Sequence, residues 1–504
     1  MTSAQMRDLE QASFKRGITV DDLMQRAGAA VAEAASALGR PVLVLVGPGN
    51  NGGDGVAAAQ ALHESGLEAS LYTFKRDREE PFAGTVFSAD EDPARDILRS
   101  VCSSSGVFVD ALLGTGQNRP PDEDLSSILT VVNESRGTAT LRIAVDVPTG
   151  IDADSGEVLG ICFEADRTIC MAAAKLGVVS YPGAAHAGEV TVANIGIPED
   201  LLEEIRVSTP EPSDISGLLP VRDPDSNKGS SGRLELIAGS RDFSGAPVMC
   251  SMAAYRAGAG LVEIATPRSV HHIVAAHVVE PVFRPLAEVD GSVGSDALDS
   301  VEDAFSKAKA CVVGPGLGLT DATVSFMRGL LALIKKREIP CLIDADGLNA
   351  LAKIDRWWEL GTNNLVLTPH PGEMSRLAGR SIREIQQDRL STAREHAEKW
   401  NATVVLKGAG TVIASPAGEA VINSTGGPNL ATAGTGDVLS GVIGALLVQG
   451  LSPFHASVCG VYLHGRAGDL LRAEIGDIGT LASDLIDALP EARLSILEQA
   501  EVTT

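Results

Sequence analysis

The sequence predicts an α/β protein with two domains, each a mostly parallel sheet flanked by helices. Its 504 residues correspond to two or three domains at roughly 150 residues each. Strand-like apolar runs alternate with helical segments in both halves, which is typical of parallel sheets. A stretch at 198–232, rich in Pro, Ser and Asp, interrupts this alternation. We therefore expect a first domain at 1–205, a linker at 206–224 and a second domain at 225–500.

The elements of the first half follow in a regular order. Three runs predict strands, and the first of them, Pro41–Val46, is continuously apolar, as expected for a strand buried on both faces. Each run ends in a glycine-rich or acidic turn, and ligands of parallel sheets bind at the carboxyl ends of the strands. The predicted elements are helix Leu23–Leu38, strand Pro41–Val46, helix Val56–Ser65, strand Gly106–Asp110 and strand Leu141–Val147.

The second half repeats this alternation after the linker. Six short apolar runs predict strands, and two small-residue segments beside glycine-rich turns predict helices. The strands are Leu234–Ala238, Leu261–Ala265, Ala310–Val313, Pro340–Ile343, Asn364–Leu367 and Ala402–Leu406, and the helices are Ala246–Gly258 and Val438–Leu447.

Composition excludes several classes of protein. Lys and Arg number 41 and Asp and Glu 66, a formal net charge of −25, so the chain lacks the basic surface of a nucleic-acid-binding protein. Hydrophobic residues make up 44%, which excludes wholesale disorder. An uncharged stretch of 28 residues at Val438–Gly465 contains Pro453. It predicts two short buried helices rather than a membrane span.

Cysteine usage indicates the cellular compartment. The seven cysteines form no CxxC pair, which favours reduced thiols over a disulfide framework or a zinc site. The first residues are polar and contain no apolar run of the kind found in secretory signals. We therefore expect a cytoplasmic protein without a membrane partner.

The segment Gly49–Gly55, GNNGGDG, follows the first strand and opens a helix. Its glycines let backbone N–H groups approach a phosphate, and the start of a helix favours an anion. Asn50, Asn51 and Asp54 add amide and carboxylate oxygens. A tight turn with polar caps is the alternative, but this combination of residues favours a ligand site.

Oxygen-bearing side chains follow the next two strands of the first half. Asn51, Asp110 and Thr149 would together form a set of oxygen ligands suited to an alkali or alkaline-earth cation. Asp146 could act as an acid or base if it is buried. Each of these residues alone could instead cap a turn.

The segment Gly434–Asp437, GTGD, opens an apolar helix. Gly434 and Gly436 would leave backbone N–H groups free to form an anion hole for developing phosphate charge. Asp437 at this position could deprotonate a substrate hydroxyl. A capping aspartate with a glycine turn is the alternative.

Other strand ends of the second half carry weaker signals. Lys407–Thr411 is typical of a nucleotide contact, and Gly314–Gly318 of a backbone platform for a ligand. His370 could bind substrate or phosphate or be structural, and Glu373 could support a metal or water. Asp344 and Asp346 are equally explained by helix capping.

Together these motifs resemble a known family. Residues 1–205, with QMRDLE, LMQRAGAAVAE, GPGNNGGDG, DALLGTG and DVPTGID, resemble the NAD(P)H-hydrate epimerase domain, which has a Rossmann-like fold. Residues 225–495, with KGSSGRLELIAGS, GPGLG, DADGLN, TPHPGE, KGAGT and TAGTGDVLSG, resemble the ADP-dependent (S)-NAD(P)H-hydrate dehydratase, which has a ribokinase-like fold. Both halves together are similar to the bifunctional enzymes that repair nicotinamide nucleotides.

The resemblance implies roles for individual residues. Potassium ligands are implied at Asn51, Asp110 and Thr149, and catalytic carboxylates at Asp146 and Asp437. In the first half, the hydrate-binding positions are Asn50, Asn51, Gly52, Gly53, Asp54, Gly114, Thr115, Gly116, Gln117, Asn118, Arg119, Pro120 and Asp146. In the second half, the hydrate-binding positions are Ala246, Gly316, His370 and Asp437, and the adenine-nucleotide positions are Lys407, Gly408, Ala409, Gly410, Thr411 and Gly436, with Gly434 at the phosphates.

The resemblance also implies the reaction and its requirements. The first domain would interconvert the R and S hydrates. The second would use ADP and Mg²⁺ to dehydrate the S form, giving NAD(P)H, AMP and phosphate. The first domain would hold K⁺, and the chain would form a homo-oligomer built on tetramers. Motif spacing does not distinguish ADP from ATP, but the two-domain fusion favours ADP.

The sequence departs from the family pattern at several places. Asn118 stands where a basic residue is frequent, Thr149 replaces a frequent Ser, and Asn227 replaces a frequent His. The stretch CMAAAKLGVVSYPG is diverged and places Lys175 earlier than the usual basic residue.

Two alternatives remain open. One is a ribokinase-like small-molecule kinase with an N-terminal nucleotide-binding module, although such kinases do not need the GNNGGDG segment. The other is an active second domain joined to a first domain that only binds ligand.

Overall fold

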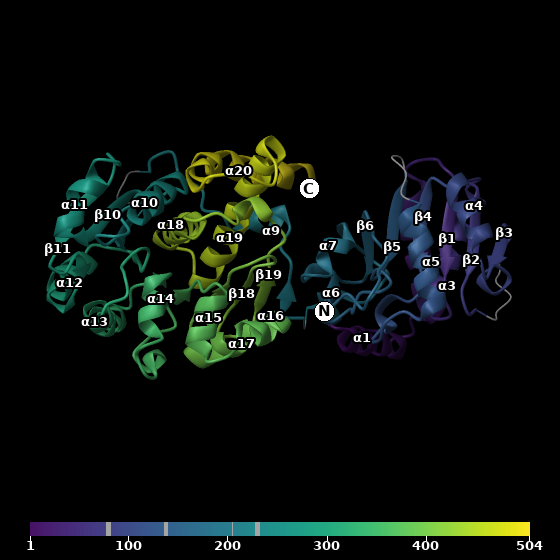
Figure 1. Cartoon of the computed structure of the whole chain (residues 1–504), viewed down its shortest axis with the longest axis horizontal. Helices are drawn as coiled ribbons and strands as arrows, with labels where there is room; N and C mark the ends of the chain where they lie inside the picture. The colour runs from purple at the N-terminus through teal and green to yellow at the C-terminus, as the bar shows by residue number, and fades with distance from the viewer. Residues whose placement is uncertain (77–81, 136–139, 204, 227–231, 504) are drawn as a thin grey trace. The chain divides into compact units, whose positions relative to one another are not determined.

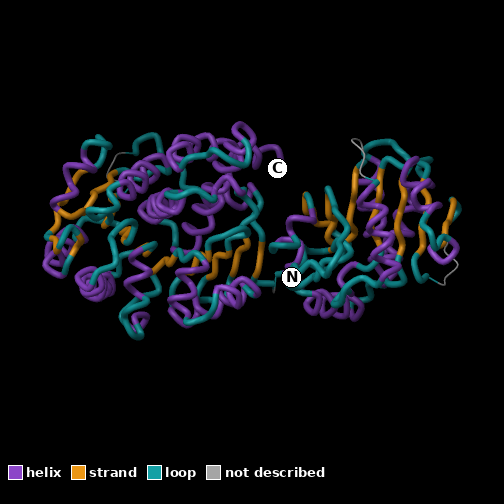
Figure 2. Tube along the Cα trace, viewed as in Figure 1, coloured by secondary structure: helices purple, strands orange, loops and turns teal. Residues whose placement is uncertain are grey.

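The computed structural model describes residues 1–76, 82–135, 140–203, 205–226 and 232–503. The chain divides into two compact units, Met1–Ile205 and Arg206–Thr504, and each unit has its own sheet (Figure 1). Asn227 and most of the KGSSG motif lie outside the described residues. Helices and strands alternate along both units (Figure 2).

The first unit is built on a seven-stranded sheet in the order β3-β2-β1-β4-β5-β6-β7, and every neighbouring pair is parallel. Its core has the 3-2-1-4-5-6 order of Rossmann folds. The strands are β1 (Val42–Val46), β2 (Ala69–Thr73), β3 (Thr85–Ser88), β4 (Val107–Ala111), β5 (Leu141–Val145), β6 (Arg167–Met171) and β7 (Glu189–Ala193).

Helices cover both faces of this sheet. Val42, Val44 and Val46 share a core with α1, α2 and α3, while Leu43 and Leu45 pack with α4 and α5 on the other face because side chains alternate along a strand. The helices are α1 (Ser3–Lys15), α2 (Val20–Ser36), α3 (Asn50–Glu64), α4 (Asp96–Ser104), α5 (Glu123–Glu134), α6 (Leu176–Val179), α7 (Ala184–Ala187) and α8 (Glu199–Leu202), with 3-10 turns η1 (Ala89–Glu91) and η2 (Gly114–Gly116).

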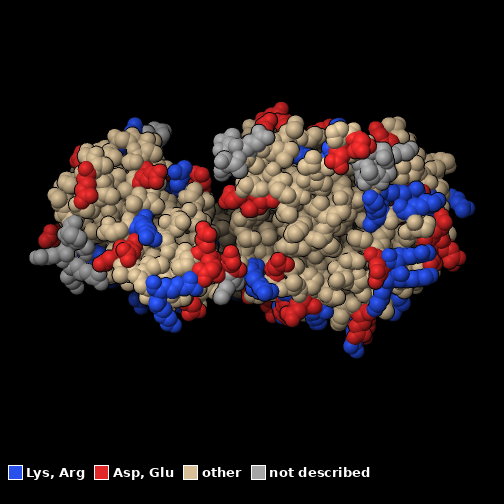
Figure 3. All heavy atoms as spheres, turned by 180° about the vertical axis from the view of Figure 1, so that it is seen from behind, with Lys and Arg blue, Asp and Glu red and all other residues tan. Residues whose placement is uncertain are grey.

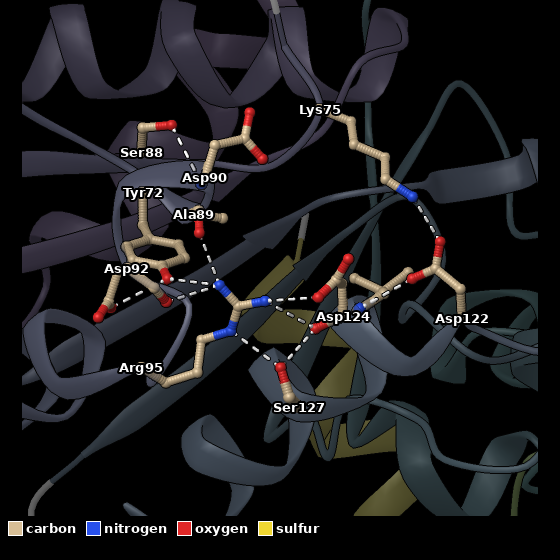
Figure 4. Close-up of polar contacts among 11 residues, drawn as sticks. Tyr72, Lys75, Ser88, Ala89, Asp90, Asp92, Arg95, Asp122, Asp124 and Ser127 are labelled. Atoms are coloured by element: carbon tan, nitrogen blue, oxygen red, sulfur yellow. Dashed lines mark hydrogen bonds and ion pairs between the residues drawn. The ribbon is translucent and has the colours of Figure 1, made fainter.

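A buried arginine, Arg95, connects the segment that follows β3 with α5 (Figure 4). The Arg95 guanidinium donates to the carbonyl oxygens of Ala89 and Asp92, both at 2.8 Å, and to Ser127 Oγ at 2.8 Å. Nearby, Lys75 Nζ lies 2.5 Å from Asp122 Oδ2 at the start of α5. These contacts hold the segments after β2 and β3 against α5, the helix that follows the 114–120 loop.

The second unit is built on a mixed ten-stranded sheet in the order β11-β10-β9-β14-β15-β16-β17-β18-β19-β8. Its strands are parallel except where β18 pairs with β17 and β19. The strands are β8 (Val207–Ser208), β9 (Arg233–Ile237), β10 (Leu261–Pro267), β11 (Val282–Leu286), β14 (Ala310–Val313), β15 (Cys341–Ile343), β16 (Leu365–Leu367), β17 (Thr403–Leu406), β18 (Val412–Ala414) and β19 (Ala420–Ile422), beside a separate hairpin of β12 (Glu288–Val289) and β13 (Ser292–Val293).

Two helical layers enclose the second sheet. Leu234 and Leu236 of β9 pack with α10, α18, α19 and α20, and Figure 1 shows α13, α14, α15 and α17 on the opposite side. The helices are α9 (Pro212–Leu218), α10 (Gly245–Arg256), α11 (Arg268–Ala275), α12 (Leu298–Phe305), α13 (Asp321–Arg337), α14 (Asp346–Leu351), α15 (Pro371–Ala378), α16 (Ile382–Gln387), α17 (Arg389–Trp400), α18 (Thr435–Val448), α19 (Pro453–Ile475) and α20 (Ala482–Thr503), with 3-10 turns η3 (Ser295–Ala297), η4 (Trp357–Glu359) and η5 (Pro428–Leu430).

Each strand predicted from the sequence is present, to within two residues at either end. The uncharged stretch forms two helices, as predicted, but α19 has 23 residues and is not short. Pro453 starts α19, where a missing N–H costs nothing, so the helix runs on without a break. Among the described residues, no helix is long and apolar enough to cross a membrane.

The segment 206–224 adds structure to the second unit. β8 pairs with β19, and Ile215 of α9 is fully buried in the core beside α19 and α20. Apolar residues such as Ile215 and Leu219 hold this stretch on the domain despite its content of proline and serine.

Candidate functional sites

The GNNGGDG segment forms the first turns of α3. The helix begins at Asn50, six residues before the predicted Val56, with Gly49 as its N-cap. The reason is steric: a Cβ on Gly52 would lie 2.1 Å from the Gly47 carbonyl oxygen, and one on Gly53 would lie 2.4 Å from Met24 Cε. The two glycines let the helix start at the carboxyl end of β1, where its first N–H groups form the kind of site that binds an anion.

Asp110 and Thr149 meet directly at this edge of the sheet. Thr149 donates to the fully buried Asp110 carboxylate through its backbone N, at 2.7 Å, and its Oγ1, at 2.8 Å. Burial raises the pKa of Asp110 to about 6, although these hydrogen bonds lower it. Among the described residues, no lysine or arginine forms an ion pair with Asp110.

Asn51 lies beside this pair. With its amide nitrogen toward Val145 O, at 3.1 Å, the amide oxygen accepts from Gly114 N at 3.3 Å. Gly114 has a φ of +65°, and a Cβ there would lie 2.8 Å from the Asn51 side chain. Asn51 thus bridges the ends of β4 and β5, so the structure brings the three predicted cation ligands to one edge.

Asp146 pairs with a buried lysine after β6. Its carboxylate accepts from Lys175 Nζ in a very short contact and from Met171 N at 2.9 Å. Lys175 is fully buried and also donates to Met171 O at 2.7 Å. Burial, with Asp146 and Glu10 nearby, raises the pKa of Asp54 well above its ordinary value. Asp54 and Asp146 therefore belong to one site.

The loop at 114–120 divides into two parts. Gln117 is buried, and its Oε1 accepts from Gly150 N at 2.6 Å, so this side chain holds the loop against the segment after β5. Gly116, Asn118, Arg119 and Pro120 are exposed, and Thr115 is partly exposed. These exposed residues are the part of the loop that solvent reaches.

In the second unit, α18 begins at the GTGD segment. Gly434 is the N-cap with a φ of +92°, and Asp437 lies in the first turn. Burial, together with the carboxylates of Asp344 and Asp346, raises the pKa of Asp437 to about 7, while Lys407 opposes this shift. A carboxyl group with this pKa can act as a base near neutral pH.

A buried ion pair lies next to this helix start. Lys407 Nζ, after β17, donates to Asp344 Oδ1 at 2.7 Å, and Asp344 follows β15. Ser440 Oγ of α18 donates to Asp344 Oδ2 at 2.7 Å. Glu373 lies 4.0 Å from Lys407 Nζ, and burial raises the pKa of Glu373 to about 7. One lysine is thus shared by several carboxylates.

The other predicted positions of the second unit lie at the same edge of the sheet. A Cβ on Gly316 would lie 3.1 Å from Ala246 Cβ, so these two positions are neighbours. His370 caps α15: its Nδ1 accepts from Gly372 N at 3.0 Å. Gly408, Ala409, Gly410 and Thr411 form a turn after β17 that is partly or fully exposed.

Sequence reasoning assigned no role to three contacts of these sites. Lys175 stood out only as a departure from a pattern, Asp344 only as a cap, and Ser440 not at all. The strand-end position of Asp344 was a signal for its role. Ser440 follows Asp437 by three residues, and this spacing puts both on one helix face.

Fold and site geometry define a class: a two-domain α/β protein with carboxylates and helix starts at the carboxyl edges of both sheets, suited to phosphorylated small molecules. A family model described as NAD(P)H-hydrate dehydratase matches residues 234–491, and one described as YjeF-related protein N-terminus matches residues 20–177.

Whole-chain relatives carry both domains. Bifunctional NAD(P)H-hydrate repair enzymes named Nnr are 38% identical in Thermofilum pendens, over 97% of this chain and 95% of that protein, and 36% identical in Moorella thermoacetica, over 99% and 98%. The crystal structure of an ADP/ATP-dependent NAD(P)H-hydrate dehydratase from Bacillus subtilis, co-crystallised with ATP and Mg²⁺, is 33% identical with a TM-score of 0.50. It covers 58% of this chain and 99% of that chain. This chain belongs to the family of bifunctional NAD(P)H-hydrate repair enzymes, so the predicted family and the α/β fold class are confirmed.

Proposed function

We propose that the chain repairs hydrated nicotinamide nucleotides in two reactions. The first unit interconverts the R and S epimers of NAD(P)H hydrate, and the second dehydrates the S epimer with ADP, giving NAD(P)H, AMP and phosphate. The main observation behind the dehydratase activity is the position of Asp437 in the first turn of α18, where its pKa of about 7 suits a base.

In the second unit, ionised Asp437 takes the proton of the hydrate hydroxyl, and the hydroxyl oxygen attacks the terminal phosphoryl group of ADP. AMP leaves, phosphate then leaves the hydrated ring carbon, and the neighbouring ring carbon loses a proton to solvent as the double bond re-forms. The N–H groups at Gly434–Gly436 stabilise the charge on the transferring phosphoryl group. Lys407 lies beside them: a Cβ on Gly436 would be 3.5 Å from its Nζ.

The excess of carboxylates over lysine around Lys407 fits a divalent cation. Glu373, with its pKa raised to about 7 by burial, would hold Mg²⁺ together with the nucleotide phosphates. Bound there, Mg²⁺ would neutralise phosphate charge.

In the first unit, Asp146 is the acid–base group of epimerisation. Lys175 holds the Asp146 carboxylate in place. Asp146 gives a proton to the hydroxyl group as that group leaves the hydrated carbon as water, and takes a proton back when water adds on the opposite face. The buried charge of Asp110, which no described lysine or arginine pairs, fits a monovalent cation held by Asn51, Asp110 and Thr149. K⁺ would neutralise that charge.

The test follows the recovery of nicotinamide absorbance from a mixture of R and S NADH hydrate, with ADP and with ATP. Wild type should convert both epimers with ADP. Asp437→Asn should convert neither, and Asp146→Asn only the S epimer. Asp321→Asn, an exposed acid in the first turn of α13, is the control and should match wild type.

Three other outcomes contradict parts of the proposal. No recovery with either nucleotide refutes the dehydratase, and a phosphorylated product that persists identifies a small-molecule kinase. Recovery of only the S half in wild type makes the first unit a binding module.

The family resemblance also supports a cytoplasmic homo-oligomer built on tetramers. Sedimentation of the purified chain tests the oligomeric state.

A further inference from the structure

Asp344 connects three elements of the second unit through its two carboxylate oxygens. It follows β15 and is only 1% exposed. Oδ1 accepts from Lys407 Nζ at the end of β17, and Oδ2 accepts from Ser440 Oγ in α18, both at 2.7 Å. Its backbone N donates to Val313 O at 3.0 Å, so the carboxylate is anchored on the central strands.

The three groups lie against the turn that opens α18. A Cβ on Gly436 would be 3.5 Å from Lys407 Nζ and 3.8 Å from Asp344 Oδ2. Ser440 is fully buried and lies on the face of α18 that carries Asp437. The ammonium group and the first N–H groups of the helix therefore occupy one small region.

Lys407 has a competing partner. Its side chain is a flexible four-carbon stem, and Glu373 Oε2 lies 4.0 Å from Nζ. If the Asp344 charge were removed, the buried ammonium would lose its hydrogen-bonded anion and Glu373 would be the nearest carboxylate in contact with it.

We infer that Asp344 is a positioning residue for phosphoryl transfer, which holds the Lys407 ammonium against the first turn of α18 and, through Ser440, fixes that turn relative to the sheet. This inference rests on the proposed dehydratase function. A cation held at the helix start stabilises phosphoryl charge only while its position is fixed, because preorganisation is the source of such stabilisation. Asp344 itself touches neither the hydrate nor the nucleotide in this role.

Burial and charge agree with this role. Burial raises the pKa of Asp344, but the Lys407 ammonium and the Ser440 hydroxyl lower it further, and the net pKa lies below its ordinary value. The carboxylate is therefore ionised at neutral pH. It is an anion held between Lys407 and Ser440.

The experiment compares Asp344→Asn, Ser440→Ala and the double variant Asp344→Asn/Lys407→Met in the full-length chain. We expect Asp344→Asn to lower kcat for ADP-driven dehydration by about 100-fold, the scale found when one charge-stabilising group is lost. KM for the S hydrate should change less than about threefold, and Ser440→Ala should lower kcat by about threefold to tenfold, in line with one lost hydrogen bond. ADP affinity, measured by calorimetry, should fall about tenfold in Asp344→Asn, as expected for one displaced charge contact.

The double variant separates positioning from stability. It replaces a buried ion pair with neutral side chains, a change that folded proteins tolerate, so its melting temperature should return toward wild type while kcat stays low. Epimerisation by the first unit of the same chain is the internal control and should be unchanged in all variants.

Several results would overturn the inference. One is a kcat of Asp344→Asn within threefold of wild type, and another is an unchanged ADP affinity of this variant. A third is a loss of kcat that follows the melting temperature and is restored in the double variant. An inactive wild type would refute the proposed function instead, and ADP binding to wild type and Asp344→Asn would then still decide whether Asp344 positions Lys407.

Discussion

The charge on Asp437 should destabilise the folded second unit above neutral pH, and Asp437→Asn should remove that penalty. The pKa of Asp437 rises from its ordinary 3.8 to about 7 because the side chain is partly buried and lies near the carboxylates of Asp344 and Asp346. A folded-state pKa above the unfolded value means that the folded chain holds the proton more tightly. The penalty is therefore absent below pH about 4, grows between pH 4 and 7, and is complete above pH 7.

The size of this penalty follows from the difference between the two pKa values, which is about 3. At about 1.4 kcal/mol for each pH unit, the upper bound is about 4 kcal/mol. Asp437 is only partly shielded from solvent, so about 1 to 4 kcal/mol is expected. At about 2 °C per kcal/mol for a domain of this size, Asp437→Asn should raise the melting temperature by about 2 to 8 °C at pH 8.

Scanning calorimetry of the full-length chain at pH 8 and pH 5 measures this effect, with ADP used to assign the transition of the second unit. The gain should fall by more than half at pH 5, and Asp437→Asn should show no dehydration at either pH. Asp321→Asn serves as the exposed control and should give no gain. An Asp437→Asn melting temperature equal to that of wild type at pH 8, or a gain of the same size at both pH values, would show that the Asp437 charge does not destabilise the fold.

Four further predictions concern other parts of the two sites. In the wild type, kcat/KM for the S hydrate should fall about tenfold for each pH unit below pH 7 as Asp437 is protonated, and a flat profile from pH 8 to pH 6 would contradict this base. Lys175→Met leaves the Asp146 carboxylate buried without its cation, so it should destabilise the first unit by about 3 to 5 kcal/mol in urea unfolding. The double variant Asp146→Asn/Lys175→Met should recover most of this loss. A Lys175→Met variant as stable as wild type would refute the pairing. Gly441→Ala places a Cβ 2.2 Å from Cys250 O, so it should push α18 from α10 and lower the free energy of unfolding by about 1 to 3 kcal/mol. Gly245→Ala, where a Cβ meets nothing within 4 Å, is the control. Equal stabilities of the two variants would show that the helices separate freely. Epimerisation should be faster in potassium chloride than in tetramethylammonium chloride, and Asp110→Asn should abolish this difference, since it removes the buried charge that the cation neutralises; a salt preference retained in the variant would place the cation elsewhere.

The central strands flanking the sites, and the residues that follow them, could be predicted from the sequence. Continuous apolar runs such as Val42–Val46 and Ala310–Val313 identify strands buried on both faces, because only such strands lack alternation. Parallel strands end at one edge, so Asn51, Asp110 and Thr149 were expected together, and the structure brings them there. The acidic surface was also readable from composition, and Asp and Glu occur over both units on the face drawn in Figure 3.

Edge strands and helix starts were harder to predict from the sequence. β3 and β7 are partly exposed, so they lack the apolar runs that mark central strands. The early start of α3 at Asn50 depends on the close approach of Gly52 to the Gly47 carbonyl, a contact between residues on opposite sides of a turn. No local preference for helix predicts it, because glycine is a poor helix former.

The pairing of charged groups depends on the tertiary structure and could not be predicted from the sequence. Lys175 lies 29 residues from Asp146, Lys407 lies 63 residues from Asp344, and Ser440 lies 96 residues from Asp344. Each partner belongs to a different strand or helix, and the order of strands in the sheet sets which of them become neighbours. The pKa values of Asp437 and Asp110 follow from the same packing, because burial and neighbouring charges exist only in the folded chain. The sequence thus names the chemical groups at the sheet edges, and the fold sets their distances, their partners and their charge.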